Sequence, residues 1–226
     1  MSRRRQSRDR SERPEGSGFK PRSVSARTPR QKEYIKSVVD NDITFCFGPA
    51  GTGKTHIAAG MSVQMLKRKG IERVIVCRPV VSVGKDIGFL PGTLEEKIGP
   101  YLVPLFDEFS CYLERKKLKE LTAEHVIEMV PLSMMRGRTF NDSFIILDEA
   151  QNATYNEIRM LLTRIGQNST LVLSGDLRQS DLPSDCQGSF EEIGRKLVQL
   201  DGIGLVELKE EDVVRHSLIA AIERIL

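Results

Sequence analysis

The sequence predicts an α/β protein with a doubly wound, mainly parallel sheet and helices on both faces. Short apolar runs alternate along the chain with longer amphipathic segments, and strands that alternate with helices pair in parallel through right-handed crossovers. Two of the runs, FIIL in residues 144–147 and LVLS in residues 171–174, are almost continuously apolar. Such runs are typical of strands that are covered on both faces.

One folded domain with a basic N-terminal arm is the expected organisation of the 226 residues. Residues 1–30 contain ten Lys or Arg and three Asp or Glu, a net charge of +7, whereas the rest contains 24 basic and 28 acidic residues, a net charge of −4. Because residues 1–27 hold almost no apolar side chains, they are expected to be disordered by themselves. This arm either contacts nucleic-acid phosphates or is a solvated tail without a fixed partner. Residues 28–226 are expected to form the domain.

Six short, predominantly apolar runs are expected to be the strands of the sheet. They occupy residues 42–47, 73–78, 125–132, 143–149, 169–175 and 203–209. The second of them leads into a long loop with several Gly and Pro residues, 79–92.

Amphipathic segments between these runs are expected to be helices. Thr28 and Pro29 mark the start of the first helix as its N-cap and first-turn proline. Thr154 and Glu157 have the spacing of a capping box. The expected helices are residues 28–40, 54–70, 93–121 in two pieces, 154–166, 189–200 and 212–226.

Nothing in the sequence predicts a secreted or membrane protein. No apolar run approaches the roughly 20 residues that span a bilayer, and no apolar segment follows the N-terminal arginines. The four cysteines are widely scattered, and those in the first two strands are expected to be core residues. We therefore expect a cytoplasmic protein without disulfides or a structural metal. The cysteines are Cys46, Cys77, Cys111 and Cys186.

GPAGTGKT, residues 48–55, matches the phosphate-binding motif G-x-x-x-x-G-K-[ST] and stands between a predicted strand and a predicted helix. Glycines let the backbone wrap around phosphates, so that N–H groups at the helix N-terminus face the anion. Lys54 is expected to reach the β- and γ-phosphates of ATP, and Thr55 is expected to ligate Mg²⁺. The expected nucleotide-binding residues here are Gly48, Pro49, Ala50, Gly51, Thr52, Gly53, Lys54, Thr55 and His56. Spacing pairs none of the three histidines with an acidic or cysteine partner.

FIILDEAQN, residues 144–152, ends a strand on two carboxylates. Asp148 is expected to hold Mg²⁺ opposite Thr55, and Glu149 to be the general base that activates a water. An Asp-Glu pair favours hydrolysis over transfer to a small acceptor, although a small-molecule kinase stays a possible alternative.

LSGDLRQSDLP, residues 173–183, is a second apolar strand that ends in polar residues. Gln179 could reach the γ-phosphate or the attacking water. The alternative is a polar turn, in which Asp176 caps the residues that follow.

These motifs together resemble the PhoH-like family and, through it, the first RecA-like motor domain of superfamily 1 helicases. The resemblance covers roughly residues 28–225 and rests on GPAGTGKT, residues 78–107, residues 134–154 and LSGDLRQSDLP. It implies a RecA-like P-loop fold and Mg²⁺-dependent ATP hydrolysis coupled to single-stranded nucleic acid, with RNA favoured over DNA. A second motor domain, which such helicases normally have, does not fit in this chain.

The resemblance also implies roles for single residues. Gln31 would read the adenine edge, or it is an exposed helix residue. Gln151 would couple the phosphate to the nucleic-acid side, or it caps the following helix. Arg215 would act on the γ-phosphoryl group of a neighbouring subunit in a ring, a hexamer in this interpretation, or it forms a surface ion pair near Glu211.

The nucleic-acid contacts are expected after the second strand and near the fourth. The candidate phosphate ligands are Arg78, Ser82, Lys85, Arg136 and Arg138. The alternative function is an ATP-regulated RNA-binding or scaffold protein that does not unwind its partner.

Overall fold

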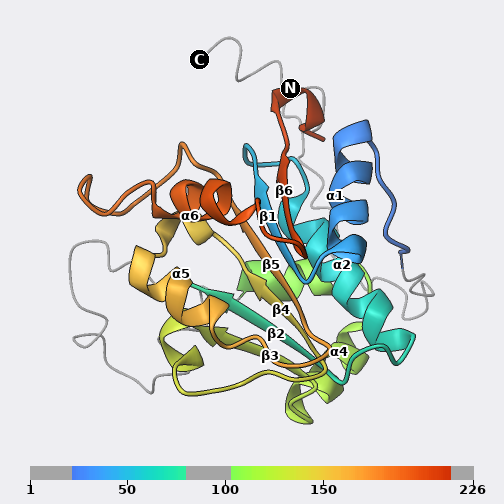
Figure 1. Ribbon diagram of the computed structural model, residues 1–226. Helices are drawn as coiled ribbons and strands as arrows, with labels where there is room; N and C mark the ends of the chain where they lie inside the picture. Colours follow the sequence, from blue (N-terminus) through green and yellow to red (C-terminus); the bar gives the residue numbers. More distant parts are fainter. Residues whose placement is uncertain (1–21, 80–102, 215–226) are drawn as a thin grey trace, which may run out of the picture.

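The computed structural model describes residues 22–79 and 103–214, which form an α/β sandwich around one sheet (Figure 1). Six strands pair in parallel in the order β3-β2-β4-β5-β1-β6. They are β1 Ile43–Phe47, β2 Arg73–Arg78, β3 Ile127–Pro131, β4 Ser143–Leu147, β5 Thr170–Gly175 and β6 Ile203–Glu207. The predicted fold class and all six predicted strands are confirmed, and every pairing in the sheet is parallel.

The helices cover both faces of the sheet (Figure 1). They are α1 Pro29–Asp40, α2 Lys54–Lys67, α4 Arg115–Ala123, α5 Tyr155–Leu162 and α6 Ser189–Leu197. Residues 103–109 are also helical. Three short 3₁₀ turns complete the described elements: η2 Leu132–Met135, η3 Ala150–Asn152 and η4 Glu210–Asp212. Among the described residues, no helix is long and apolar enough to cross a bilayer.

The N-terminal caps that the sequence predicts for two helices are confirmed. The Thr28 side chain accepts a hydrogen bond from the Gln31 N–H, and Pro29 opens α1. Thr154 and Glu157 form the reciprocal capping box of α5. At the C-terminus the expectation was wrong for its first residues, because Asp212 ends a 3₁₀ turn and is followed by two non-helical residues. The remainder of that expected helix lies outside the described residues.

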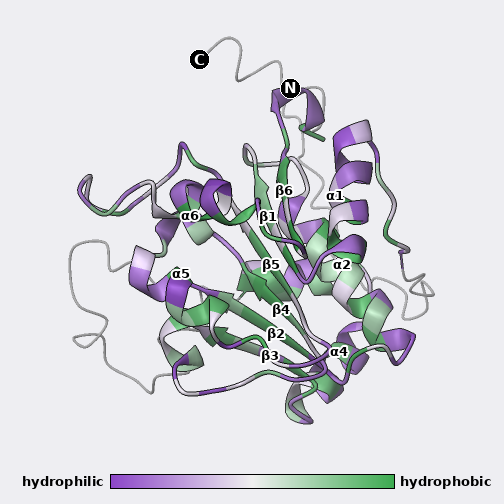
Figure 2. Ribbon diagram, in the orientation of Figure 1, coloured by the Kyte–Doolittle hydropathy of each residue, from purple (hydrophilic) through white to green (hydrophobic). Residues whose placement is uncertain are grey.

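Two apolar layers hold the helices on the sheet. One contains Tyr34 of α1, Ile57 of α2 and Leu118 of α4, and the other contains Ile158 of α5 and Phe190 of α6. Apolar colouring concentrates on the strands between the two helix layers (Figure 2). Removing this apolar surface from water stabilises the sheet and fixes where its strand ends lie.

Cys46 and Cys77 are buried in β1 and β2, as predicted for core residues. Burial raises the pKa of the Cys46 thiol to about 12. This thiol is therefore a small apolar side chain near neutral pH, because reactivity requires the thiolate.

Residues 22–27, which we call the strap, extend along α2 instead of belonging to a free arm. The Arg22 N–H donates to the Cys111 carbonyl at 3.3 Å, and Val24 packs against the apolar layer of α2. The sequence did not predict this, because a single apolar residue anchors an otherwise polar segment. Residues 1–21 lie outside the described part.

Gly60 of α2 provides the space in which the strap packs. A Cβ atom built there would overlap Val24 and would lie 2.5 Å from Cζ of Tyr112. Alanine would gain about 1 kcal/mol of helix propensity, but overpacking costs roughly 1–3 kcal/mol.

We therefore expect Gly60→Ala to lower the free energy of unfolding by up to about 2 kcal/mol, measured by urea denaturation. Gly70→Ala is the matched control, because its Cβ would make only an ordinary contact at 3.7 Å with the Met65 carbonyl. A Gly60→Ala variant more stable than the native chain would contradict the packing of the strap on α2.

Candidate functional site

The carboxyl ends of β1, β5 and β4 lie side by side at one edge of the sheet. Strand β5 pairs with both of the others. Residues 48–55 follow β1, residues 148–152 follow β4, and residues 176–180 follow β5. Ligands of open parallel sheets bind at this edge, so the three sequence motifs meet at one place.

The glycine-rich loop leads into α2, whose N-cap is Gly53. Gly51 and Gly53 adopt φ angles of 80° and 84°. The Gly53 N-cap makes no side-chain hydrogen bond, so the first-turn N–H groups of α2 face the cavity. A helix N-terminus with free N–H groups attracts anions such as phosphate.

Lys54 is folded back onto this loop. Its ammonium donates to the carbonyls of Gly48 at 2.6 Å and Pro49 at 2.9 Å. Burial lowers the pKa of Lys54 below its ordinary value. A positive charge removed from water has a strong affinity for an anion that enters beside it.

Thr55 and Asp148 meet across the sheet edge. The Thr55 hydroxyl donates to Oδ1 of Asp148 at 2.7 Å, although 93 residues separate them. Ser174 at the end of β5 donates to the same oxygen at 3.3 Å. Hydroxyl and carboxylate oxygens are the donor set that Mg²⁺ prefers, so the pair fits the expected magnesium site.

Asp148 carries an electrostatic cost in this position. Burial raises the pKa of its carboxyl above the ordinary value of 3.8, and the neighbouring Glu149 adds to the rise. The Thr55 hydroxyl and the guanidinium of Arg78, 3.6 Å from Oδ2, oppose it. A bound cation would relieve the same cost, because it compensates the buried charge.

Glu149 has a left-handed backbone conformation, and each of its carboxylate oxygens accepts a hydrogen bond. Its φ angle of 55° is uncommon for a non-glycine residue. Oε1 accepts from Arg78 at 2.8 Å, and Oε2 accepts from the Gln151 amide at 2.6 Å. The side chain lines the cavity together with Asp148.

Gln151 joins Glu149 to the segment after β5. Its amide nitrogen also donates to the Gln179 carbonyl at 3.1 Å, and its oxygen accepts from the Asp176 N–H at 3.0 Å. The residue is buried, and a Cβ atom on Gly175 would overlap its amide oxygen. It does not cap α5, whose N-cap is Thr154, so the capping alternative was wrong.

Asp176 forms the polar turn that was one expectation for this segment. Oδ1 accepts from the Arg178 N–H at 3.1 Å. Within residues 22–79 and 103–214, Oδ2 of Asp176 is the buried side-chain oxygen that has no hydrogen-bond partner. A buried acceptor of this kind is costly unless water or a ligand reaches it. Gln179 itself is exposed, and its backbone, not its side chain, meets Gln151.

Gln31 is buried against the glycine-rich loop. Its amide donates to the Thr52 carbonyl at 2.9 Å and accepts from the Arg27 N–H at 2.7 Å. The side chain is therefore not an exposed helix residue, which excludes that alternative. It lines the cavity, with one amide proton and one lone pair left for a ligand.

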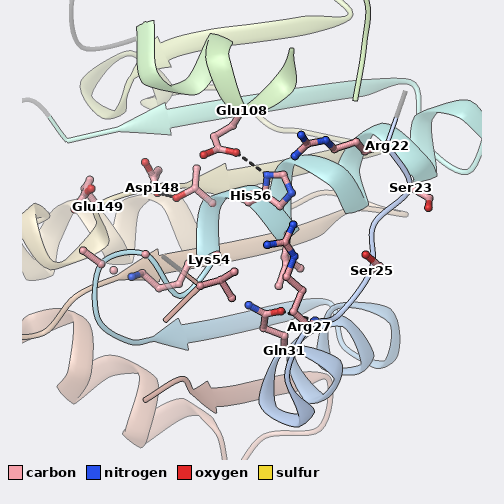
Figure 3. A pocket seen from close by; sticks show the side chains of 17 residues that line it. Arg22, Ser23, Ser25, Arg27, Gln31, Lys54, His56, Glu108, Asp148 and Glu149 are labelled. Atoms are coloured by element: carbon pink, nitrogen blue, oxygen red, sulfur yellow. Dashed lines mark hydrogen bonds and ion pairs between the residues drawn. The ribbon is translucent and has the colours of Figure 1, made fainter. Parts of the chain in front are cut away.

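A cavity of about 490 Å³ opens in front of the loop (Figure 3). Lys54, Asp148 and Glu149 lie toward one end, and the strap residues Arg22 and Arg27 lie toward the other (Figure 3). The strap therefore supplies two arginines to the cavity, at the end away from the carboxylates of Asp148 and Glu149.

His56 has acidic and cysteine neighbours that spacing did not predict. Nδ1 lies 2.8 Å from Oε2 of Glu108, 52 residues away (Figure 3). The ring also lies against Tyr112, with the centroids 4.9 Å apart. The ligand atoms of His56, Glu108 and Cys111 all lie within 4.8 Å of one another. Sequence spacing could not pair these residues, because packing of residues 103–109 beside α2 brings them together.

The structure thus divides the predicted site residues into groups. Those that line the cavity are Gln31, Ala50, Gly51, Gly53, Lys54, Thr55, His56, Asp148 and Glu149. Gly48, Pro49 and Thr52 form the loop behind it, and the Thr52 hydroxyl braces that loop by donating to the Pro49 carbonyl at 2.8 Å.

The candidate nucleic-acid contacts differ in their surroundings. Arg78 lies at the acidic pair. Arg138 pairs with Glu128 at 2.7 Å, and Arg136 is exposed. Ser82, Lys85 and Arg215 lie outside the described residues.

The residues around Arg215 bear on its expected role. Glu211, its alternative partner, pairs with Arg30 at 2.9 Å. The Val214 N–H donates to the Gly51 carbonyl at 3.1 Å, so the chain just before Arg215 meets the glycine-rich loop of its own subunit.

Comparison with known proteins gives consistent matches. The family described as PhoH-like protein matches residues 23–226. A PhoH-like protein of Bacillus subtilis (strain 168) is 43% identical over 203 residues, which cover 90% of this chain and 64% of that protein. Protein PhoH of Escherichia coli (strain K12) is 36% identical over 197 residues, which cover 86% and 56%. The chain therefore spans about three-fifths of the length of such relatives.

A solved structure shares the fold. The large terminase from a thermophilic bacteriophage aligns with a TM-score of 0.56 and 10% sequence identity, covering 88% of this chain and 50% of the terminase. At this identity the likeness concerns the fold alone.

The pKa of Asp148 leads to a stability prediction. Because the folded state raises this pKa, it disfavours the ionised carboxylate, and stability is lost as the pH rises from the ordinary value of 3.8 through the raised value. Asp148→Asn should therefore raise the free energy of unfolding at neutral pH, and the gain should shrink as the pH is lowered toward 3.8.

Denaturant unfolding at several pH values measures this effect. Asp185→Asn replaces an exposed aspartate and is the control. An Asp148→Asn variant that is less stable than the native chain at neutral pH would contradict the cost that we assign to the buried carboxylate.

Proposed function

Because the chain belongs to the PhoH-like protein family, as its sequence motifs indicate, we propose that it is a Mg²⁺-dependent ATPase that acts on single-stranded nucleic acid. The observation that carries this proposal is the contact between Thr55 and Asp148 at 2.7 Å, beside Lys54 in one cavity. It joins the phosphate-binding loop to the acidic pair that Mg²⁺-dependent hydrolysis requires.

Triphosphate binding is assigned to the N-terminus of α2. The free N–H groups of its first turn face the phosphates, and Lys54 turns from the Gly48 and Pro49 carbonyls to the γ-phosphate. Thr55 and Asp148 would hold Mg²⁺, which would neutralise negative charge on the phosphates. At the other end of the cavity, Gln31 and His56 adjoin the nucleoside, and Gln31 offers its remaining donor and acceptor to the base.

Water activation is assigned to Glu149. Its carboxylate lies at the mouth of β4 beside Asp148 and lines the cavity. A positioned general base of this kind contributes about 10²- to 10⁴-fold to a rate.

Coupling to nucleic acid is assigned to Gln151. Its amide bonds to Glu149 on one side and to residues 176–180 on the other. If Glu149 moves when the γ-phosphate is present or absent, the Gln151 amide moves with it and disturbs residues 176–180. A movement of residues 176–180 would reach Glu149 through the same amide. RNA is the proposed nucleic acid, with DNA as the alternative.

Assembly into a ring is a separate part of the proposal. A ring of identical subunits would supply the second half of each nucleotide site, with Arg215 as the candidate donor of positive charge. The position of Val214 at the Gly51 carbonyl equally favours an Arg215 that acts in its own subunit.

A second function is an ATP-regulated RNA-binding or scaffold protein with slow turnover. The observation that favours it is the engagement of both Glu149 oxygens, by Arg78 and by Gln151. These two contacts restrict how the carboxylate can turn toward a water, although each oxygen keeps one lone pair.

Steady-state ATP turnover with and without single-stranded RNA or DNA tests the proposed function. Glu149→Gln should lower turnover by about 10²-fold or more and leave ATP affinity close to that of the native chain. Lys54→Ala is the control that should lose binding as well.

The outcomes separate the two functions. Stimulation of the native chain by RNA supports the motor function, and turnover indifferent to both nucleic acids supports the scaffold. Equal loss of ATP binding and turnover in Glu149→Gln would contradict the general-base role.

A further inference from the structure

The carboxylate of Glu149 is held from two sides. Nη2 of Arg78 lies 2.8 Å from Oε1, and Nε2 of Gln151 lies 2.6 Å from Oε2. Hydrogen bonds between charged partners are among the stronger ones in proteins. A general base needs a lone pair directed at the attacking water. Each carboxylate oxygen has one of its two lone pairs occupied, so a water must compete with Arg78 and Gln151 for the carboxylate in this arrangement.

Arg78 reaches Glu149 from the side of β2. It is the last residue of that strand, and Cys77 pairs with Leu147 at the end of β4. The Asp148 N–H also donates to the Cys77 carbonyl at 2.9 Å, which fixes the two strand ends against each other. The guanidinium is therefore carried by the rigid sheet, and 71 residues separate it in sequence from its glutamate.

Arg78 does not line the nucleotide cavity, whereas Asp148 and Glu149 do. Its side chain is one-fifth exposed, and the carboxylate of Glu149 is 39% exposed. The guanidinium and the carboxylate are thus both partly exposed to solvent. A ligand that attracts Arg78 can act on Glu149 without displacing ATP.

The backbone of Glu149 has a conformation that a glutamate does not favour. A left-handed φ angle of 55° at a glutamate is held by its surroundings rather than preferred by the residue. Gln151 and Arg78 are two of the contacts that hold it. Loss of the Arg78 contact would leave the carboxylate tethered through Gln151 alone and would leave Oε1 open to a water in the cavity that the side chain lines.

We propose that Arg78 is a positioning residue that holds Glu149 in the described orientation and releases it when a nucleic-acid phosphate takes the guanidinium. This inference rests on the proposed function and adds the residue through which nucleic acid controls hydrolysis. Guanidinium binds phosphate oxygens with two parallel N–H groups, as it binds a carboxylate. The phosphate of a bound strand therefore competes directly with Glu149.

Steady-state kinetics of Arg78→Ala at saturating Mg²⁺ test this, with and without single-stranded RNA. Without RNA the kcat of the variant should rise about threefold to fivefold, the effect expected from loss of a partly exposed ion pair. The KM for ATP should change less than kcat, because Arg78 does not line the cavity and saturating Mg²⁺ compensates for the positive charge lost beside Asp148. RNA should then add almost no stimulation.

Two further variants make the result specific. Arg195→Ala removes an arginine that pairs with Glu191, also at 2.8 Å, on the exposed surface of α6, and it should leave kcat and the RNA response unchanged. Arg78→Lys keeps a positive charge near Asp148 but loses the planar group, so its kcat should lie between those of the native chain and Arg78→Ala. If thermal unfolding reveals that Arg78→Ala is not folded, the lysine variant alone decides.

The outcomes distinguish this inference from the proposed function. A fall in kcat, with or without RNA, or an RNA stimulation equal to that of the native chain would overturn the role of Arg78 alone. If the native chain has no turnover that depends on Lys54, the proposed function fails and the role of Arg78 fails with it.

Discussion

The hydrogen bond between Thr55 and Asp148 is the contact on which the arrangement of the site depends. It joins the first turn of α2, which follows β1, to the end of β4. The contact can form because β1 and β4 are both parallel to β5, which lies between them in the sheet. Each strand delivers its polar residues to the same edge. The apolar layers on the two faces hold this edge in register, so packing remote from the cavity determines the distance between the two oxygens.

Several features of the site oppose stability. Asp148 is ionised only at the cost of burial, Glu149 has a left-handed backbone, and one oxygen of Asp176 is buried without a partner among the described residues. Costs of this kind are common where a protein keeps groups ready for a ligand. They lie on strand ends that meet at the cavity, whereas the central strands β1, β2, β4 and β5 are almost fully buried.

Motifs that are local in sequence could be predicted, and contacts between distant residues could not. The glycine-rich loop, the acidic pair and the capping box of Thr154 and Glu157 each lie within a few residues, so spacing alone reveals them. Glu108 reaches His56 through the packing of two helical segments, and Arg78 reaches Glu149 through strand pairing. The burial of Gln31 depends on how α1 packs against the glycine-rich loop. The apolar periodicity of α1 does not specify this packing.

The nucleotide affinity of the native chain and of Thr55→Val, each with Mg²⁺ and with a chelator, tests the central claim most directly. Valine keeps the shape of threonine but removes the oxygen that faces Asp148. Mg²⁺ should tighten ATP binding to the native chain, and Thr55→Val should lose most of this dependence while still binding ATP through the loop. An equal Mg²⁺ dependence in both proteins would contradict the assignment of Thr55 and Asp148 as the metal-binding pair.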